Sequence, residues 1–259
     1  MITILSTTKS LSYKTPTPSI IPTIPTFWQD SKSLTDILKN LSSKDLEKLM
    51  AISPKLAELN WQRFQNFSIP FNKQNSKPAL FLFDGDVYQA MEIANYDLED
   101  LEFAQNHLNI LSGLYGILKP LDLIQDYRLE MGTNITKILG QSLIQFWQQK
   151  VVDYLNGELK NQDERTIINL ASAEYLAVID GSKINGKIIN IIFKEKKIQN
   201  DKIIYKTIGI FSKKARGSMM NFIIKNKITK SQDLKNFAIG NYNFRSELSD
   251  QNNWYFYRQ

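Results

Sequence analysis

The sequence predicts a mixed α/β (α+β) fold, a central mixed β-sheet surrounded by helices within one domain that spans residues 1–259. Three observations lead to this prediction. Short apolar runs typical of buried strands are intermingled with amphipathic helical patterns along the chain. No linker with a shift in composition divides these segments. A chain of 259 residues, 42% hydrophobic and 22% charged, is also long enough to bury one large core.

The first hundred residues are expected to hold a strand, an extended segment and several helices. Residues 2–5 form a short apolar strand, and four prolines between residues 16 and 25 keep the next segment extended, because proline lacks an amide donor. Helical patterns follow over 30–50, with a break near residue 40, where Ser42 and Asp45 offer a capping box.

Two further elements complete the N-terminal half. A helix beginning at Ser53 and Pro54 is expected to place Leu56, Leu59 and Phe64 on its apolar stripe. Residues 79–83 (ALFLF) are a continuous apolar run, which favours a buried strand ending at the acidic turn that follows.

The C-terminal half alternates between the two kinds of element. Its expected elements are a helix capped by Asp97 and ending near 108, a helix over 141–155, a buried strand over 166–170, a hairpin-like pair over 187–193 and 203–211, a helix over 212–227, a short helix near 231 and a strand over 254–257.

Composition excludes several classes of site. The chain has no cysteine and a single histidine, His107. Disulfides, thiolate catalysis, zinc ribbons and sites with two imidazole ligands are therefore excluded within one chain, and we expect neither a metal nor a cofactor. The apolar runs are too short for a signal peptide or a membrane span, so we expect a cytoplasmic protein without membrane contact.

Charge is distributed unevenly along the chain. Residues 183–235 hold 14 Lys or Arg and three acidic residues, whereas residues 84–102 hold seven carboxylates and no base. Such a molecule can present a basic face to a polyanion. The alternative is compositional bias, because lysine is frequent throughout the sequence.

The segment LSGLYG over 111–116 is the first candidate for binding. Gly113 and Gly116 resemble the glycines of a helix-hairpin-helix turn, in which exposed amides hold a phosphate, and Lys119 would add a charge. The alternative is a plain tight turn between buried elements.

Four other polar segments could carry chemistry. Arg128 and Glu130 would point the same way on an extended segment and could form an ion pair or position an anion. Three further groups follow expected strand ends or open helices, and each has a purely structural reading as a turn, a helix cap or a solvated charge: Asp84 with Asp86, Ser172 with Glu174, and Lys213 with Lys214 and Arg216.

Together these segments resemble the YaaA family of bacterial peroxide stress proteins. The matching runs occur in the family's order over nearly the whole chain: FDGDVY over 83–88, FAQNHL over 103–108, LSGLYG over 111–116, KPLD over 119–122, YRLEMG over 127–132, INLAS with EY over 168–175, and KKARG over 213–217. The family's opening Ser-Pro-Ala-Lys is replaced here, so that only Ser6 and Lys9 carry over.

The resemblance implies a one-domain fold with a basic cleft that binds duplex or distorted DNA, and a helix-hairpin-helix element at 113–116. It also implies a role in peroxide stress, in which damage from unincorporated intracellular iron is limited. Because the chain lacks soft metal ligands, its effect on iron is expected to be indirect.

Two interpretations of function follow. The leading one is a non-enzymatic, cytoplasmic protein that binds DNA without sequence preference and has no catalytic residue. It would hold phosphates through Gly113, Tyr115, Gly116, Lys119, Lys213, Lys214 and Arg216.

The alternative is an enzyme that acts on a nucleotide or another phosphorylated small molecule. Its pocket would comprise Lys9, Asp84, Asp86, Arg128, Glu130, Ser172, Glu174 and the shared Lys213. One deep pocket that holds Asp86, Arg128 and Lys213 would favour the enzyme, whereas a long basic groove would favour nucleic acid. A structural partner protein without a ligand is the third possibility.

Overall fold

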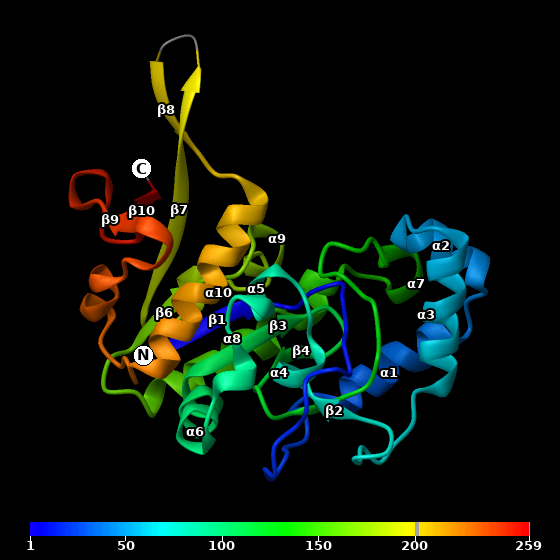
Figure 1. The fold of residues 1–259 in the computed structure, drawn as a ribbon. Helices are drawn as coiled ribbons and strands as arrows, with labels where there is room; N and C mark the ends of the chain where they lie inside the picture. The colour runs from blue at the N-terminus through cyan, green and yellow to red at the C-terminus, as the bar shows by residue number, and fades with distance from the viewer. Residues whose placement is uncertain (200–201, 259) are drawn as a thin grey trace.

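A mixed β-sheet forms the centre of the computed structural model, which describes residues 1–199 and 202–258 (Figure 1). Its strand order is β4-β3-β1-β6-β7-β10-β9, and β8 pairs with β7 outside this path. The strands are β1 (Ile2–Ser6), β3 (Leu108–Ser112), β4 (Gly116–Leu118), β6 (Thr166–Asn169), β7 (Lys187–Gln199), β8 (Lys202–Lys206), β9 (Tyr242–Phe244) and β10 (Asn253–Arg258). A separate antiparallel pair joins β2 (Lys77–Pro78) to β5 (Leu123–Ile124).

The middle of the sheet is parallel. β1 runs parallel to both β3 and β6, and β7 and β10 continue in the same direction, whereas β4, β8 and β9 are antiparallel to their neighbours. Residues 2–5 of β1 are all buried, so side chains on both faces of this strand are covered. Central parallel strands need such cover on both sides, which explains why they appear in the sequence as continuous apolar runs.

Helices surround this sheet. α10 contacts α5, α6 and β7, α8 packs on β4, and α1, α2 and α3 form a group of their own (Figure 1). The α-helices are α1 (Trp28–Lys39), α2 (Ser43–Met50), α3 (Pro54–Asn66), α4 (Ala79–Leu82), α5 (Asp86–Gln89), α6 (Leu98–His107), α7 (Thr136–Leu139), α8 (Leu143–Lys160), α9 (Ala173–Leu176) and α10 (Gly209–Lys225). Short 3₁₀ helices cover Ile93–Asn95, Gly181–Lys183, Ser231–Asn236, Ile239–Asn241 and Ser246–Leu248. None of the helices in the described ranges combines the length and apolarity needed to cross a membrane.

The predicted fold class is confirmed, and so are most elements. Ser42 and Asp45 form the expected capping box at the start of α2, and Asp97 caps α6 in the same manner. β7 and β8 form the expected antiparallel pair, although α10 begins at residue 209 rather than 212.

The prediction of a strand over residues 79–83 is wrong. This run forms the helical turn α4, in which all four residues are buried. The amides of Ala79 and Leu80 donate to the carbonyl oxygens of Asp122 and Pro120, both at 2.9 Å. A continuous apolar run indicates burial on every side, and a helical turn enclosed by neighbouring chain supplies that burial as well as a strand does.

The predicted apolar stripe of α3 is only partly correct. Phe64 is 1% exposed, but Leu56 is 39% exposed and Leu59 is 41% exposed. The helix instead turns Ala57, Asn60 and Phe64 toward the core. Asn60 tolerates this position because its side-chain amide donates to the carbonyl oxygen of Leu56 at 2.7 Å, which satisfies part of its hydrogen-bonding capacity within the helix.

The segment expected to form a helix-hairpin-helix element is a β-hairpin. Residues 113–115 connect β3 to Gly116, the first residue of β4, and all four of these residues are buried. The carbonyl oxygen of Gly113 accepts a hydrogen bond from Trp147 Nε1 at 2.9 Å, and a Cβ at Gly113 would lie 2.3 Å from the carbonyl oxygen of Leu129. These backbone groups face the protein interior, so the phosphate site predicted at Gly113, Tyr115 and Gly116 is wrong. The glycines allow close packing instead.

A ladder of asparagines crosses the sheet where β6 ends. Asn169, Asn190 and Asn253 are in register on β6, β7 and β10. Asn169 Nδ2 donates to Asn190 Oδ1 at 2.8 Å, and Asn190 Nδ2 donates to Asn253 Oδ1 at 3.1 Å. Asn169 Oδ1 also accepts from the amide of Ala171 at 2.9 Å, which holds the turn that leads into Ser172.

Candidate functional site

A pocket of about 660 Å³ lies at the carboxyl ends of β1 and β6. Residues 5–10, which end β1 and follow it, line one wall, and residues of the turn after β6 line another. The chain passes from β1 to β3 on one side and later places β6 on the other side, so the strand order reverses at β1. Open α/β sheets bind their ligands at such a reversal, outside the carboxyl ends of the strands.

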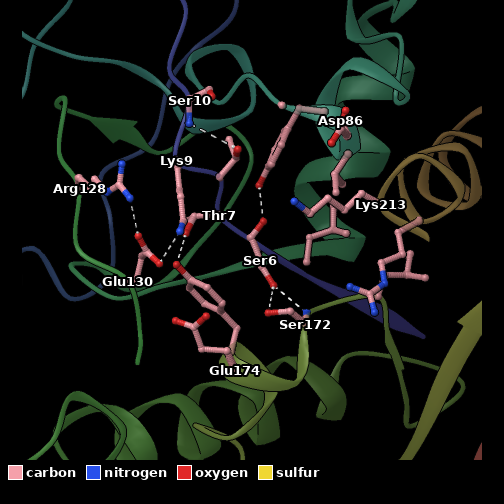
Figure 2. Close-up of a pocket in the computed structure, with 18 of the residues that line it drawn as sticks. Ser6, Thr7, Lys9, Ser10, Asp86, Arg128, Glu130, Ser172, Glu174 and Lys213 are labelled. Carbon is pink, nitrogen blue, oxygen red and sulfur yellow. Dashed lines mark hydrogen bonds and ion pairs between the residues drawn. The ribbon is translucent and has the colours of Figure 1, made fainter. Parts of the chain in front are cut away.

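Charged side chains from five separate segments meet in this pocket (Figure 2). Four basic and three acidic residues line it, a net of one positive charge: Lys9, Arg128, Lys213, Arg216, Asp86, Glu130 and Glu174. The pocket thus brings together Asp86, Arg128 and Lys213, although they are far apart in the sequence.

On one side of the pocket, two cations share a single carboxylate. Glu130 accepts from Lys9 Nζ through Oε2 at 2.9 Å and from Arg128 Nη2 through Oε1 at 3.0 Å. The expectation that Arg128 and Glu130 point the same way is met by a direct ion pair. Both cations on this side therefore already have a carboxylate partner.

The opposite side holds charges without partners. Lys213 and Arg216 lie three residues apart on α10, and neither side chain forms a hydrogen bond or ion pair within residues 1–199 and 202–258. Arg216 Nε is buried without an acceptor, and burial lowers the pKa of this guanidinium. The carboxylate of Asp86, drawn above Lys213 in Figure 2, also forms no hydrogen bond or ion pair in this part of the chain. Arg216 is part-buried, and an unpaired cation that loses hydration in this way costs free energy that a bound anion would offset.

Hydroxyl groups form the floor between these two sides. The amide of Ser172 donates to Ser6 Oγ at 2.8 Å, and the hydroxyl of Thr7 donates to the phenol oxygen of Tyr175 at 2.9 Å. The hydroxyl of Tyr88 donates to the carbonyl oxygen of Ser6 at 3.0 Å. Burial raises the pKa of Tyr175 to about 12, so its phenol remains a neutral hydrogen-bonding group at neutral pH.

Glu174 is held in place by a backbone contact. Its Oε1 accepts from the amide of Gly132 at 2.9 Å. Ser172 occupies the N-cap position of α9, as the capping interpretation expected, but its side chain does not cap the helix. Its hydroxyl lies 3.4 Å from Ser6 Oγ in the pocket instead.

Besides the hairpin residues, three charged residues that were singled out in the sequence lie outside the pocket lining. Asp84 Oδ1 accepts from Gln89 Nε2 at 2.8 Å. Lys119 forms an ion pair with Glu158 and is not free to bind phosphate beside the buried hairpin, which corrects its predicted role. Lys214 is exposed on α10, one residue beyond the pocket-lining Lys213.

Sequence reasoning missed the neutral residues of the site. Thr7, Tyr88 and Tyr175 line the pocket but carry no charge that would mark them. Their proximity to Ser6, Asp86 and Glu174 in the sequence was the available signal.

The described residues contain no cluster of three or more His, Cys, Asp or Glu side chains suited to a metal ion. His107 lies on α6, and its Nδ1 donates to the carbonyl oxygen of Met1 at 2.8 Å.

Comparison with known proteins places the chain in a family. Residues 1–248 match the family model described as peroxide stress protein YaaA. The chain belongs to the YaaA family. A UPF0246 protein of Acaryochloris marina is 46% identical over 258 residues, and one of Saccharophagus degradans is 45% identical over 259 residues, each alignment covering the whole of both chains. A third, from Francisella philomiragia, is 44% identical over 253 residues, which cover 97% of this chain and 98% of that protein.

The YaaA-like sequence runs fall into two groups in the structure. The runs over 83–88, 127–132, 168–175 and 213–217 all contribute residues to the pocket. The runs over 103–108, 111–116 and 119–122 contribute none to its lining; the first two belong to α6, β3 and the buried hairpin.

Proposed function

We propose that this YaaA-family protein is an enzyme that binds a phosphorylated small molecule, such as a nucleotide, in the pocket at the carboxyl ends of β1 and β6. The observation that supports this proposal is the meeting of charged residues from four YaaA-like sequence runs and from the loop after β1 in one pocket. Its volume of about 660 Å³ lies within the range of small-molecule sites. A flat DNA-binding face would have no need of such a depression.

The lining supplies the groups that phosphate chemistry uses. Its cations match a phosphate, and its hydroxyls and carboxylates match the hydroxyl groups of a ribose or sugar. Asp86 has a carboxylate without a partner among the described residues, which can accept a ligand hydroxyl or act as a general base. Glu174 keeps one carboxylate oxygen available after Oε1 has accepted from Gly132.

A ligand screen tests this proposal. Thermal unfolding is followed with inorganic phosphate, nucleoside mono-, di- and triphosphates and sugar phosphates, and unphosphorylated nucleosides serve as controls. A ligand at 100 times its Kd should stabilise the folded protein by about 2.7 kcal/mol. If no phosphorylated compound raises the Tm above the nucleoside controls, the proposal fails.

The proposed activity would serve the peroxide stress role of the family in the cytoplasm. We propose that it limits damage from unincorporated iron indirectly, because the donor set of this chain suits a phosphate better than a ferrous ion. In cells lacking the protein, wild type should restore growth under peroxide and Asp86→Asn should not. If Asp86→Asn restores growth as fully as the wild type does, the pocket is not required for the role in peroxide stress.

Binding of duplex DNA is the second candidate function. It is favoured by exposed lysines on two adjoining elements: Lys196 and Lys197 on the β7–β8 ribbon, and Lys213 and Lys214 on α10. Figure 1 shows this ribbon projecting beyond the rest of the sheet, and only two residues separate β8 from α10. A two-stranded ribbon fits the major groove, and lysine contacts with phosphates carry no base sequence information.

Fluorescence anisotropy with a labelled duplex across a salt series tests the DNA proposal. Replacing Lys196 and Lys197 together by alanine should flatten the slope of log affinity against log salt by about 1.8, since each phosphate contact contributes about 0.9. Binding that is absent at low salt would contradict DNA binding, and an unchanged slope would exclude the ribbon.

A further inference from the structure

We infer that the phosphate group of the ligand binds to Arg216 and Lys213 on α10, and not to Arg128, so that α10 supplies the phosphate subsite of the pocket. This inference rests on the proposed function of the same pocket. It assigns an orientation to the ligand, with its phosphate at α10 and its remaining part toward Glu174 and Glu130.

Arg216 is the strongest indication. Its Nε is buried and has no acceptor, as is also true of Arg128 Nε. The difference is that the Arg216 guanidinium forms no hydrogen bond or ion pair with any described residue, whereas Arg128 is paired with Glu130. A guanidinium has five N–H donors in a planar arrangement that matches phosphate oxygens. Arg216 is only part-buried, but a charged group that loses part of its hydration without gaining a partner is still destabilised. A bound phosphate would supply the missing acceptors and the missing negative charge.

Lys213 is placed to assist. It lies three residues before Arg216 on the same helix, so that both side chains are on one face, and both line the pocket. Figure 2 shows Lys213 extending into the space beneath Asp86 without a dashed contact. Lys214 carries the same charge one residue later but does not line the pocket, because successive helical residues point about 100° apart.

Arg128 is a poor alternative for the phosphate. Glu130 bridges Arg128 at 3.0 Å and Lys9 at 2.9 Å, so both cations already have a carboxylate partner. A phosphate bound there would have to displace Glu130 or lie against its negative charge. Arg128 and Lys9 instead hold Glu130 in a fixed position, where it can meet a different part of the ligand.

The groups between these two ends indicate the chemical class of the ligand. Ser6, Ser172 and Glu174 line the floor and offer hydroxyl and carboxylate oxygens. Such groups recognise hydroxyls rather than apolar surface. A phosphomonoester of a hydroxylated compound, such as a ribose phosphate or nucleoside monophosphate, fits this order of groups.

Calorimetric titration of the protein with AMP and with ribose 5-phosphate, at constant ionic strength, tests the assignment. Lys213→Ala and Arg216→Gln should each weaken binding by about tenfold, the loss expected from one charge-assisted hydrogen bond. Lys214→Ala is the matched control, since it removes the same charge from the same helix and should change affinity by less than about twofold. Lys213 is exposed, so its variant remains informative even if Arg216→Gln fails to fold.

The outcomes separate the inference from the proposed function. Loss of binding in Arg128→Ala but not in Lys213→Ala would overturn the α10 subsite and leave the pocket as the binding site. Equal losses of affinity in Lys213→Ala and Lys214→Ala would show that the two lysines attract the ligand only by long-range electrostatics, and the α10 subsite would be refuted. If no phosphorylated compound of the wider screen binds the wild-type protein, the proposed function fails and this assignment fails with it.

Discussion

Replacement of Gly116 by alanine should destabilise the fold by about 2–5 kcal/mol. Gly116 ends the β3–β4 turn with φ +69°, a left-handed conformation that costs a residue with a side chain about 1–2 kcal/mol. A Cβ there would also lie 2.5 Å from Cε3 of Trp147, a fully buried side chain. Overpacking of this kind adds about 1–3 kcal/mol, because Trp147 is held by its neighbours and by its hydrogen bond to Gly113.

Gly140→Ala is the matched control for this prediction. Gly140 has φ +79°, but a Cβ there would meet nothing within 4 Å, so only the conformational cost of about 1–2 kcal/mol remains. Urea unfolding followed by far-UV circular dichroism measures both variants, and the m-value should stay constant while the midpoint falls. The packing argument is refuted if the two variants lose equal stability, or if Gly116→Ala stays within about 0.5 kcal/mol of the wild type.

Three further predictions concern the rest of the molecule. Burial lowers the pKa of His107, so the unfolded chain binds this proton more readily than the folded protein does. The free energy of unfolding should therefore fall as the pH drops through about 6.5. The part of this fall that is due to His107 should be missing in His107→Gln. Identical pH profiles of stability for the wild type and the variant would contradict the prediction. Asp100→Asn should lower the free energy of unfolding, measured in urea, by about 2 kcal/mol. The reason is that this buried carboxylate accepts hydrogen bonds from Lys225, at 2.6 Å, and from Lys227. A loss below about 0.5 kcal/mol would show that these ion pairs contribute little to stability. Phe64→Ala should lower the free energy of unfolding by about 3–5 kcal/mol and Leu59→Ala by less than about 1 kcal/mol, since only Phe64 is buried. Equal losses of stability in the two variants would contradict this and mean that both side chains support the core.

Elements defined by local contacts were predictable from the sequence. Ser42 and Asp45 satisfy each other's backbone amides across one helical turn, so the start of α2 is encoded within four residues. The apolar runs over 2–5 and 166–170 are strands because both faces of a central parallel strand are covered. The run over 79–83 is equally apolar, and its helical form depends on the carbonyl oxygens of residues 120 and 122, which lie far along the chain.

The site was predictable in its residue types but not in its detailed geometry. Polar residues at strand ends indicated a ligand crevice, because parallel strands bring their carboxyl ends to one edge. Three basic residues occur within 213–216. Which of them line the pocket depends on which face of α10 is turned toward it: Lys213 and Arg216 lie on that face, and Lys214 does not. The two glycines of the hairpin predicted a turn, either phosphate-binding or simply tight, and not a close approach to other parts of the chain. They could not identify Trp147 and the backbone near residue 129 as the groups approached.

The position of β1 at the centre of the sheet has a consequence for how the protein is made. The ribosome completes this strand first, yet its partners β3 and β6 begin only at residues 108 and 166. Contacts this distant in sequence form slowly, because a long loop must close before they are gained. Until β6 emerges, Ile2 and Ile4 have no complete sheet to enter, and the nascent chain carries an unpaired apolar strand that invites association with other chains. The pocket needs the loop after β1, the turn after β6 and the start of α10 together, so it is complete only when synthesis has passed residue 216.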